Sequence, residues 1–189
     1  VAGVDEAGRG PLAGPVVAAA VILPAEEEEM LRGIKDSKKM TEEEREACYE
    51  TLTQSKKVTI GVSVIEHEVI DEINILQATM LGMSSAVKQL EEPPDFVLVD
   101  GNRCPSDLSA PSQAIVKGDS KCMAIAAASI IAKVTRDRIM KEHHERWPVY
   151  DFAQHKGYGT SRHVAAISKH GPCPIHRKTF EPIKSLLAA

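Results

Sequence analysis

Residues 14–23, with the sequence GPVVAAAVIL, constrain the fold of this chain more than any other stretch. The run is apolar and partly β-branched and it ends at Pro24, so it is predicted to form a strand that is buried on both faces. Its consecutive alanines leave room for helices to pack closely against that strand. A strand covered on both sides by helices is typical of a layered α/β arrangement.

The remaining elements extend this arrangement. Short apolar or alternating runs predict further strands over residues 1–4, 57–64, 95–100 and 114–117. Apolar residues at helical spacing and Ala-rich composition predict helices over residues 41–52, 74–90, 123–145 and 161–169, with a helical turn over 66–71. Thr41 and Glu44 are spaced as a capping box at the start of the first helix. This order predicts a mixed sheet flanked by helices.

Composition places the chain among soluble globular proteins. It has 189 residues, 43% hydrophobic and 26% charged, which is enough for one domain with a substantial core. No apolar run reaches the length of a membrane span. The four cysteines (Cys48, Cys104, Cys122 and Cys173) are widely scattered, which favours a reducing compartment, and we expect a cytoplasmic protein.

Charge is distributed unevenly along the chain, although the net charge is only −4. Residues 133–189 hold 11 Lys and Arg against 5 Asp and Glu, whereas residues 1–132 hold 12 against 22. The C-terminal part can therefore present a basic face to a polyanion, or the surface can simply be dipolar with no partner. The acidic run at residues 26–29 predicts a solvated loop or the start of a helix, with no function.

Four acidic residues occupy equivalent places, because each follows an apolar strand and lies next to a glycine or a turn: Asp5, Glu6, Asp100 and Asp119. The carboxyl ends of strands converge on the ligand crevice of α/β sheets. Carboxylates gathered there repel one another unless cations neutralise them, and such oxygen ligands suit Mg²⁺ or Mn²⁺. Two such ions about 4 Å apart can activate a water and stabilise the leaving oxygen of a phosphodiester.

Bland alternatives remain for each acid. Asp5 and Glu6 could belong to a solvated turn, Asp100 could be a turn acid before Gly101, and Asp119 or its neighbour Ser120 could cap a helix. Adjacent residues of a regular strand point to opposite faces, so Asp5 and Glu6 can share a site only if the strand breaks or twists. The glycines at positions 8 and 10 would permit that.

Several motifs together resemble those of bacterial ribonuclease HII, the type 2 ribonuclease H family. They run in order along almost the whole chain: DEAGRGP at 5–11, GP at 14–15, DSKK at 36–39, VDG at 99–101, KGD at 117–119, the Ala-rich stretch 126–133, and HKGY at 155–158. The resemblance implies an α/β ribonuclease H-like fold with a central five-stranded mixed sheet flanked by helices and a helical C-terminal segment. It also implies a catalytic domain over residues 1–146 with residues 147–189 packed on it, most simply as one continuous domain.

The resemblance further implies an endonuclease that hydrolyses the RNA strand of RNA–DNA hybrids. Members of the family also nick duplex DNA on the 5′ side of an embedded ribonucleotide, leaving 3′-hydroxyl and 5′-phosphate ends, with Mg²⁺ or Mn²⁺ as the cofactor. Asp5, Glu6, Asp100 and Asp119 would then be the catalytic, metal-binding acids of a two-ion site. The expected partners are the hybrid and the ribonucleotide-containing duplex, with a monomeric enzyme, no membrane, and no prediction about a clamp-type partner.

The resemblance also assigns substrate contacts. Gly8, Arg9 and Gly10 would contact the sugar and phosphate at the ribonucleotide, and Tyr158 would stack on the following deoxyribose. The 2′-hydroxyl alone distinguishes RNA from DNA at a nucleotide, and a segment flanked by glycines can approach it with its backbone. Read alone, Tyr158 would be a packing residue. Basic residues that could contact phosphate are Lys38, Lys39, Lys117, Lys156, Arg162, His163, His176 and Arg177.

Other classes of function fit the sequence less well. A non-catalytic hybrid-binding protein of the same fold is the main alternative, but a pure binder gains nothing from carboxylates that face phosphates. A zinc site built from Cys104, Cys122, Cys173 and His176 would lack a second paired half beyond the CxxH spacing at 173–176. A Cys–His nucleophilic enzyme has no supporting local context.

Overall fold

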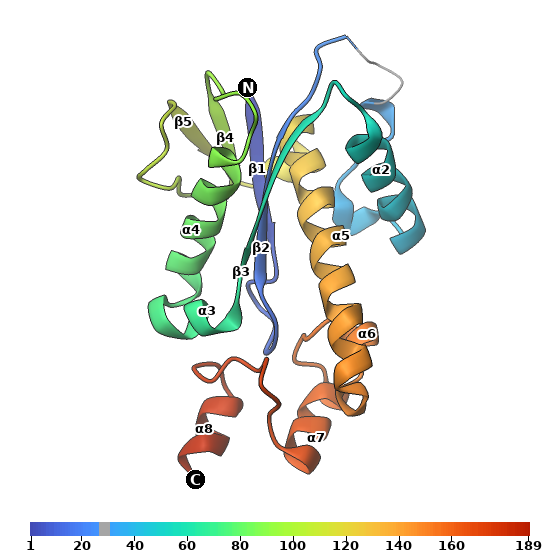
Figure 1. Ribbon diagram of the computed structural model, residues 1–189, viewed down its shortest axis with the longest axis vertical. Helices are drawn as coiled ribbons and strands as arrows, with labels where there is room; N and C mark the ends of the chain where they lie inside the picture. Colours follow the sequence, from blue (N-terminus) through green and yellow to red (C-terminus); the bar gives the residue numbers. More distant parts are fainter. Residues whose placement is uncertain (27–30) are drawn as a thin grey trace.

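The computed structural model describes residues 1–26 and 31–189, so most of the acidic run at 26–29 lies outside the described residues. A five-stranded sheet runs through the centre in the order β3-β2-β1-β4-β5 (Figure 1). The strands are β1 (Ala2–Ala7), β2 (Val16–Ile22), β3 (Thr59–Ile65), β4 (Val97–Asp100) and β5 (Ser112–Ile115). Pairs β1–β2 and β2–β3 are antiparallel, and pairs β1–β4 and β4–β5 are parallel. The predicted mixed sheet is confirmed.

Strand β2 explains why the sheet carries helices on both faces. Val17, Ala19 and Val21 pack with α5 (Met123–Arg146) on one side. Ala18 and Ala20 pack on the opposite side with Met83 of α4 (Ile75–Lys88). Figure 1 shows α3 (His67–Ile73) and α4 on one face of the sheet and α2 (Glu42–Gln54) and α5 on the other. The small residues of β2 thus allow the two layers of helix to approach the sheet, as the sequence predicts.

Helix α5 lies against β1, the strand that carries the first two acids. A Cβ atom on Gly3 would lie 2.2 Å from the carbonyl carbon of Ala124, so only glycine allows this backbone-to-backbone approach. Helix α2 begins as predicted, because the Thr41 hydroxyl accepts a hydrogen bond from the Glu44 amide at 3.2 Å and the Glu44 carboxylate accepts one from the Thr41 amide at 2.8 Å. Short 3₁₀ helices η1 (Ser37–Lys39) and η2 (Gly118–Ser120) lie on the connections.

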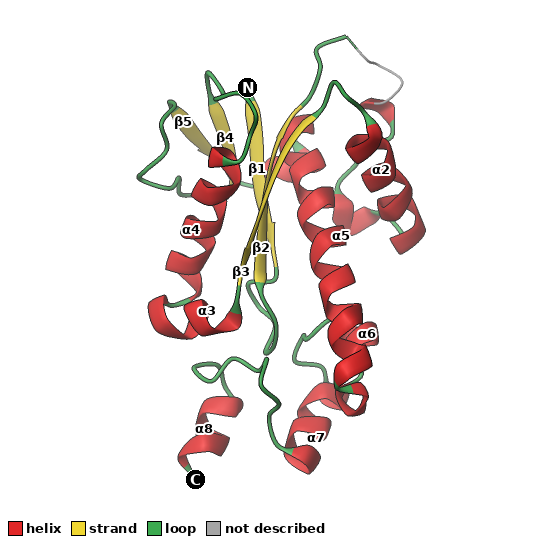
Figure 2. Cartoon of the chain, viewed as in Figure 1, coloured by secondary structure: helices red, strands yellow, loops and turns green. Residues whose placement is uncertain are grey.

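The C-terminal segment extends the molecule beyond the end of the sheet (Figure 2). It contains η3 (Pro148–Tyr150), α6 (Phe152–His155), α7 (Ser161–His170) and α8 (Ile183–Ala188). Its buried core joins Phe152 and Ile167 to Leu12 and Ala13 of the β1–β2 connection. The segment therefore touches the loop that follows the first acids, while the predicted boundary at residue 146 stays a prediction. Among the described residues, no helix is both long and apolar enough to span a membrane.

Candidate active site

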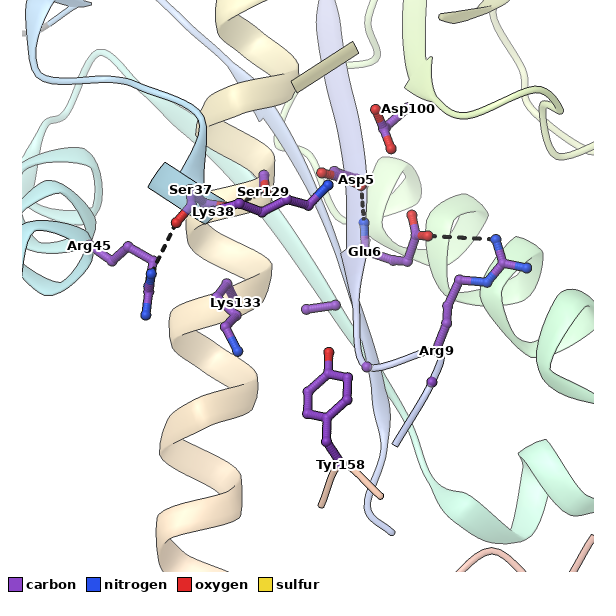
Figure 3. A pocket seen from close by; sticks show the side chains of 13 residues that line it. Asp5, Glu6, Arg9, Ser37, Lys38, Arg45, Asp100, Ser129, Lys133 and Tyr158 are labelled. Atoms are coloured by element: carbon purple, nitrogen blue, oxygen red, sulfur yellow. Dashed lines mark hydrogen bonds and ion pairs between the residues drawn. The ribbon is translucent and has the colours of Figure 1, made fainter. Parts of the chain in front are cut away.

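A pocket of about 300 Å³ opens at the carboxyl ends of β1 and β4 (Figure 3). Its walls differ in charge: three acids lie on the sheet, and cations come from neighbouring elements. The residues that line it are Asp5, Glu6, Ala7, Gly8, Arg9, Gly10, Ser37, Lys38, Arg45, Asp100, Ser129, Lys133 and Tyr158. The structure therefore brings three of the four predicted acids into one pocket with residues 8–10 and Tyr158.

Asp5, Glu6 and Asp100 form what we call the acidic cluster. Each offers a carboxylate oxygen, and these oxygens lie within 4.8 Å of one another. Of the two ways in which Asp5 and Glu6 were expected to share a site, a break in the strand is not the one observed, because β1 continues to Ala7 and stays paired with β2. The Asp5 carboxylate instead turns along its own chain and accepts a hydrogen bond from the Glu6 amide at 2.8 Å. That local turn brings the two side chains together without breaking the strand.

The acidic cluster is poorly compensated by the rest of the protein. Burial, reinforced by the neighbouring carboxylates of Glu6 and Asp100, raises the pKa of Asp5 well above its usual range. Burial also raises the pKa of Glu6. The Glu6 Oε2 atom is buried and has no hydrogen-bond partner among the described residues, and its other oxygen lies 3.8 Å from the Arg9 guanidinium. Buried, mutually repelling carboxylate oxygens of this kind fit a divalent cation.

Asp100 is held in place by the KGD motif. Its Oδ1 atom accepts hydrogen bonds from the Gly118 amide at 2.8 Å and the Asp119 amide at 3.3 Å. A Cβ atom at position 118 would lie 3.3 Å from that same oxygen and 2.6 Å from the Ile125 side chain. Glycine at this position therefore lets two backbone amides orient the acid that ends β4.

Asp119 lies beside the acidic cluster and is paired with a lysine. It is 6% exposed, and its Oδ2 atom lies 3.3 Å from the Lys38 ammonium. That bond raises the pKa of Lys38. The helix-cap alternative is wrong, because Cys122 occupies the N-cap of α5 and the Ser120 hydroxyl donates to the Lys117 carbonyl at 2.8 Å.

Residues 8–10 and Tyr158 line the pocket below the acidic cluster in the view of Figure 3. Gly8 has φ +97°, and a Cβ atom there would lie 2.1 Å from the Arg136 side chain, so another residue would be both strained and obstructed. A Cβ atom on Gly10 would lie 3.8 Å from the Tyr158 ring. That ring is 42% exposed, so Tyr158 is a pocket residue rather than a member of the core.

The predicted basic residues fall in different places. Lys38 lines the pocket, and Lys39 lines a neighbouring groove of about 430 Å³ that also contains Asp119. Lys117 and Arg162 are exposed, with Arg162 3.2 Å from Asp151. Lys156 is mostly buried, and its ammonium donates to the Ala153 carbonyl.

Three of the predicted phosphate contacts are wrong, because His163, His176 and Arg177 are buried at 0%, 1% and 0% exposure. The two histidines lie 3.0 Å apart through their Nε2 atoms, and His163 Nδ1 lies 2.8 Å from the Tyr158 carbonyl oxygen. Arg177 donates to main-chain carbonyls rather than facing solvent. Basic character alone did not reveal that these side chains point inward.

Four polar residues that line the pocket were not predicted as site residues from the sequence: Ser37, Arg45, Ser129 and Lys133. The hydroxyls of Ser37 and Ser129 lie 2.7 Å apart, and Arg45 donates to the Ser37 carbonyl at 3.0 Å. Lys133 pairs with Asp137 at 2.9 Å and lies 5.9 Å from the centre of the Tyr158 ring. Ser129 and Lys133 are one helical turn apart on an Ala-rich helix, a polar stripe that could have drawn attention.

The zinc alternative has no support in the described part of the chain. All four cysteines are free, and no group of metal-ligand atoms there contains one of them. The His176 Nδ1 atom accepts a hydrogen bond from the Cys173 amide at 2.9 Å, so the CxxH motif closes a local turn.

Residues 2–183 match the protein-family model described as Ribonuclease HII. The chain belongs to the ribonuclease HII family. Membership identifies an enzyme, a metal-dependent ribonuclease that hydrolyses phosphodiester bonds, and indicates endonuclease activity on RNA–DNA hybrids. The non-catalytic alternative is thereby set aside.

Individual relatives agree with this family assignment. The chain is 56% identical to the ribonuclease HII of Geobacter metallireducens over 189 residues, covering 100% of this chain and 86% of the relative. It is 52% identical to that of Endomicrobium trichonymphae, covering 100% and 88%. Its fold is similar to the crystal structure of ribonuclease H2 from Pyrococcus horikoshii, with a TM-score of 0.79, 30% identity, and coverage of 98% and 95%. The predicted ribonuclease H-like fold is confirmed.

Proposed function

We propose that this ribonuclease HII cuts the RNA strand of hybrids and also nicks duplex DNA on the 5′ side of an embedded ribonucleotide. The proposed products carry 3′-hydroxyl and 5′-phosphate ends. One observation carries the proposal: the acidic cluster and residues 8–10 share a single pocket, so that a cleaving group and a sugar-reading group can act on the same nucleotide.

The proposed cofactor is a pair of Mg²⁺ or Mn²⁺ ions. Asp5, Glu6 and Asp100 would hold them, and Asp119 would contribute from the edge of the site next to Lys38. When bound, such ions activate a water and stabilise the leaving oxygen. The unpartnered Glu6 oxygen and the raised pKa of Asp5 support this assignment, because both are relieved by a nearby positive charge.

The residues around the cluster would place the nucleic acid. The backbone of residues 8–10 is unobstructed by side chains at both glycines and can approach a 2′-hydroxyl. Arg9, whose side chain is 48% exposed, can bind a phosphate with its two-pronged guanidinium. The Tyr158 ring would lie on the next sugar, where a deoxyribose fits and a hydroxyl would crowd it.

The lysines would act around this centre. Lys38, which lines the pocket, would contact phosphate at the edge of the acidic cluster, and Lys39 would do so from the neighbouring groove. The buried ammonium of Lys156 would contribute indirectly, by stabilising the turn that carries Tyr158. A monomeric state in the cytoplasm remains part of the proposal.

The test is a labelled duplex with one ribonucleotide, incubated with Mg²⁺, with Mn²⁺ or with a chelator, beside an RNA–DNA hybrid. We expect a nick 5′ to the ribonucleotide that the chelator abolishes, with a 3′ end that a polymerase can extend. A nick on the 3′ side, or cleavage that survives the chelator, would contradict the proposal. A Tyr158→Ala variant should lose more activity on the single ribonucleotide than on the hybrid, and equal losses would make the ring a packing group.

A further inference from the structure

Two buried arginines lie directly beneath residues 8–10. Arg136 of α5 and Arg177 of the C-terminal segment are 1% and 0% exposed. Within the described part of the chain, neither forms an ion pair with a carboxylate, and every hydrogen bond that they donate ends on a main-chain carbonyl. Burying a cation without an opposite charge is costly, so this arrangement calls for an explanation beyond packing.

Arg177 holds both ends of the connection between β1 and β2. Its guanidinium donates to the Gly8 carbonyl at 2.6 Å and to the Arg9 carbonyl at 2.9 Å. It also donates to the carbonyls of Gly14 and Pro15, at 3.0 and 3.2 Å. One side chain from near the C-terminus thus fixes a segment that lies more than 160 positions earlier in the chain.

These bonds determine where the amides of the segment point. In a planar trans peptide the C=O of one residue and the N–H of the next point in opposite directions. Because Arg177 draws the Gly8 and Arg9 carbonyls inward, the Arg9 and Gly10 amides point away from it. Arg9 and Gly10 are exposed and line the pocket, and neither amide has a protein partner among the described residues.

Arg136 fixes the other wall of the pocket. It donates to the carbonyls of Ala13 and Pro15, at 3.0 and 2.9 Å, and to the Lys156 carbonyl at 2.8 Å. Its guanidinium lies 5.9 Å from the centre of the Tyr158 ring. The β1–β2 connection and the turn that carries Tyr158 are therefore tied to one group.

Both guanidiniums are positively charged at neutral pH, because their pKa values lie above 7. Burial, with a smaller contribution from Arg136, lowers the pKa of Arg177 to about 9. Burial lowers the pKa of Arg136 to about 10. Charged donors of this kind form stronger hydrogen bonds than neutral ones, so the carbonyls are held firmly.

We propose that Arg177 is a positioning residue for ribonucleotide recognition: by binding the Gly8 and Arg9 carbonyls, it directs the Arg9 and Gly10 amides toward the sugar and phosphate of the substrate. Arg136 fixes the position of the turn that carries Tyr158 relative to the β1–β2 connection, because it binds both. This inference rests on the proposed function. Selectivity for a ribonucleotide thus depends on a side chain that touches no substrate and lies in the C-terminal segment.

The test compares binding of two duplexes of the same sequence, one with a single ribonucleotide and one all DNA, in the presence of a chelator. Arg177→Lys keeps a positive charge but loses the two-pronged donor geometry. We expect the ratio of the two dissociation constants to fall about tenfold toward one, as for the loss of one well-placed hydrogen bond, while affinity for the all-DNA duplex changes by less than about twofold. Tyr150→Phe is the matched control, because it removes the bond from the Tyr150 hydroxyl to the Gly171 carbonyl in the same segment without touching residues 8–10.

A folded Arg177→Lys variant that keeps the wild-type ratio would overturn the inference, as would an equal loss in Tyr150→Phe. A second measurement needs no variant: the ribonucleotide duplex should shift the Arg9 and Gly10 amide NMR signals of the wild-type protein more than the all-DNA duplex does. Equal shifts would overturn the inference even if Arg177→Lys did not fold. A wild-type protein that nicks at the ribonucleotide but shows no difference in binding would reject this inference and leave the proposed function intact.

Discussion

On either side of residues 8–10 the protein buries polar groups, and it treats them in opposite ways. The acidic cluster gathers Asp5, Glu6 and Asp100, and one carboxylate oxygen of Glu6 has no hydrogen-bond partner among the described residues. The arginine cluster, Arg136 and Arg177, donates its hydrogen bonds to backbone carbonyls. Like charges repel in both places, but of the two clusters it is the acidic one that keeps a buried oxygen, Glu6 Oε2, with no hydrogen-bond partner in the described part of the chain.

This difference indicates that the acidic cluster is a binding site for a cation, whereas the arginine cluster positions the backbone of the substrate-binding segment. An unsatisfied buried carboxylate lowers the stability of the ligand-free protein and is tolerated where a cation completes it. A satisfied buried guanidinium fixes the surrounding backbone. If this distinction is correct, substitutions in the two clusters should have opposite effects on stability and different effects on cleavage.

The largest expected effect is on cleavage by the acidic cluster. Asp100→Asn should reduce metal-dependent cleavage of an RNA–DNA hybrid by about 10³-fold or more, since it removes a charged metal ligand, while hybrid affinity changes by less than about threefold. Rates and dissociation constants measured on the same hybrid check this. Asp107→Asn is the matched control, because Asp107 is exposed and pairs with Lys88 outside the pocket. Unimpaired cleavage by Asp100→Asn would remove the metal assignment.

The next effect is on stability and concerns the arginine cluster. Arg136→Met should lower the free energy of unfolding by about 3 kcal/mol, because the carbonyls of Ala13 and Lys156 lose their Arg136 donor and the Pro15 carbonyl keeps only its longer bond from Arg177. Arg138→Met on the same helix should cost less than about 1 kcal/mol, since Arg138 is 41% exposed and pairs with Glu46 at the surface. Denaturant titrations of the two variants provide the comparison. Equal losses in the two variants would mean that the buried guanidinium of Arg136 contributes no more to the free energy of unfolding than the exposed one of Arg138.

A third prediction concerns the buried histidines next to the arginine cluster. Burial lowers the pKa of His163 and of His176 to about 4, whereas a histidine in the unfolded chain has a pKa of about 6.5. As pH falls between these values the unfolded chain takes up protons that the folded chain refuses, so stability declines by up to about 1.4 kcal/mol per pH unit for each histidine. His176→Asn should therefore flatten the loss of stability measured between about pH 6.5 and 4. An unchanged slope would show that His176 is protonated in the folded protein.

The smallest expected effect is on stability and concerns the acidic cluster. With a chelator present, Asp5→Asn should raise the free energy of unfolding by about 1 kcal/mol, because it removes one buried charge from a repelling group and keeps an oxygen that can accept from the Glu6 amide. Excess Mg²⁺ or Mn²⁺ should reverse the order by stabilising the wild-type protein more than the variant. Thermal melts under both conditions test this, and a destabilised variant in chelator would show that the cluster is satisfied without metal.

Local patterns in the sequence predicted much of the fold and part of the site. The apolar run of β2 encodes a strand buried on two faces, Thr41 and Glu44 encode a helix start, and Asp100 ends β4 as expected. Each of these features depends on residues that are neighbours along the chain. Spacing and residue type are therefore sufficient to predict them.

The tertiary structure alone decided which polar groups are buried and what they contact. The partners of Arg177 lie 162 to 169 positions away, so nothing near it in the sequence distinguishes it from an exposed phosphate contact. Asp5 and Glu6 share a site because one carboxylate bends onto the next amide, a detail that the alternation of a strand does not contain. The sequence thus determined that acids and glycines meet at the end of β1. The packing of the C-terminal segment decided how residues 8–10 are oriented there, because long-range hydrogen bonds set the direction of a peptide that has no local structure of its own.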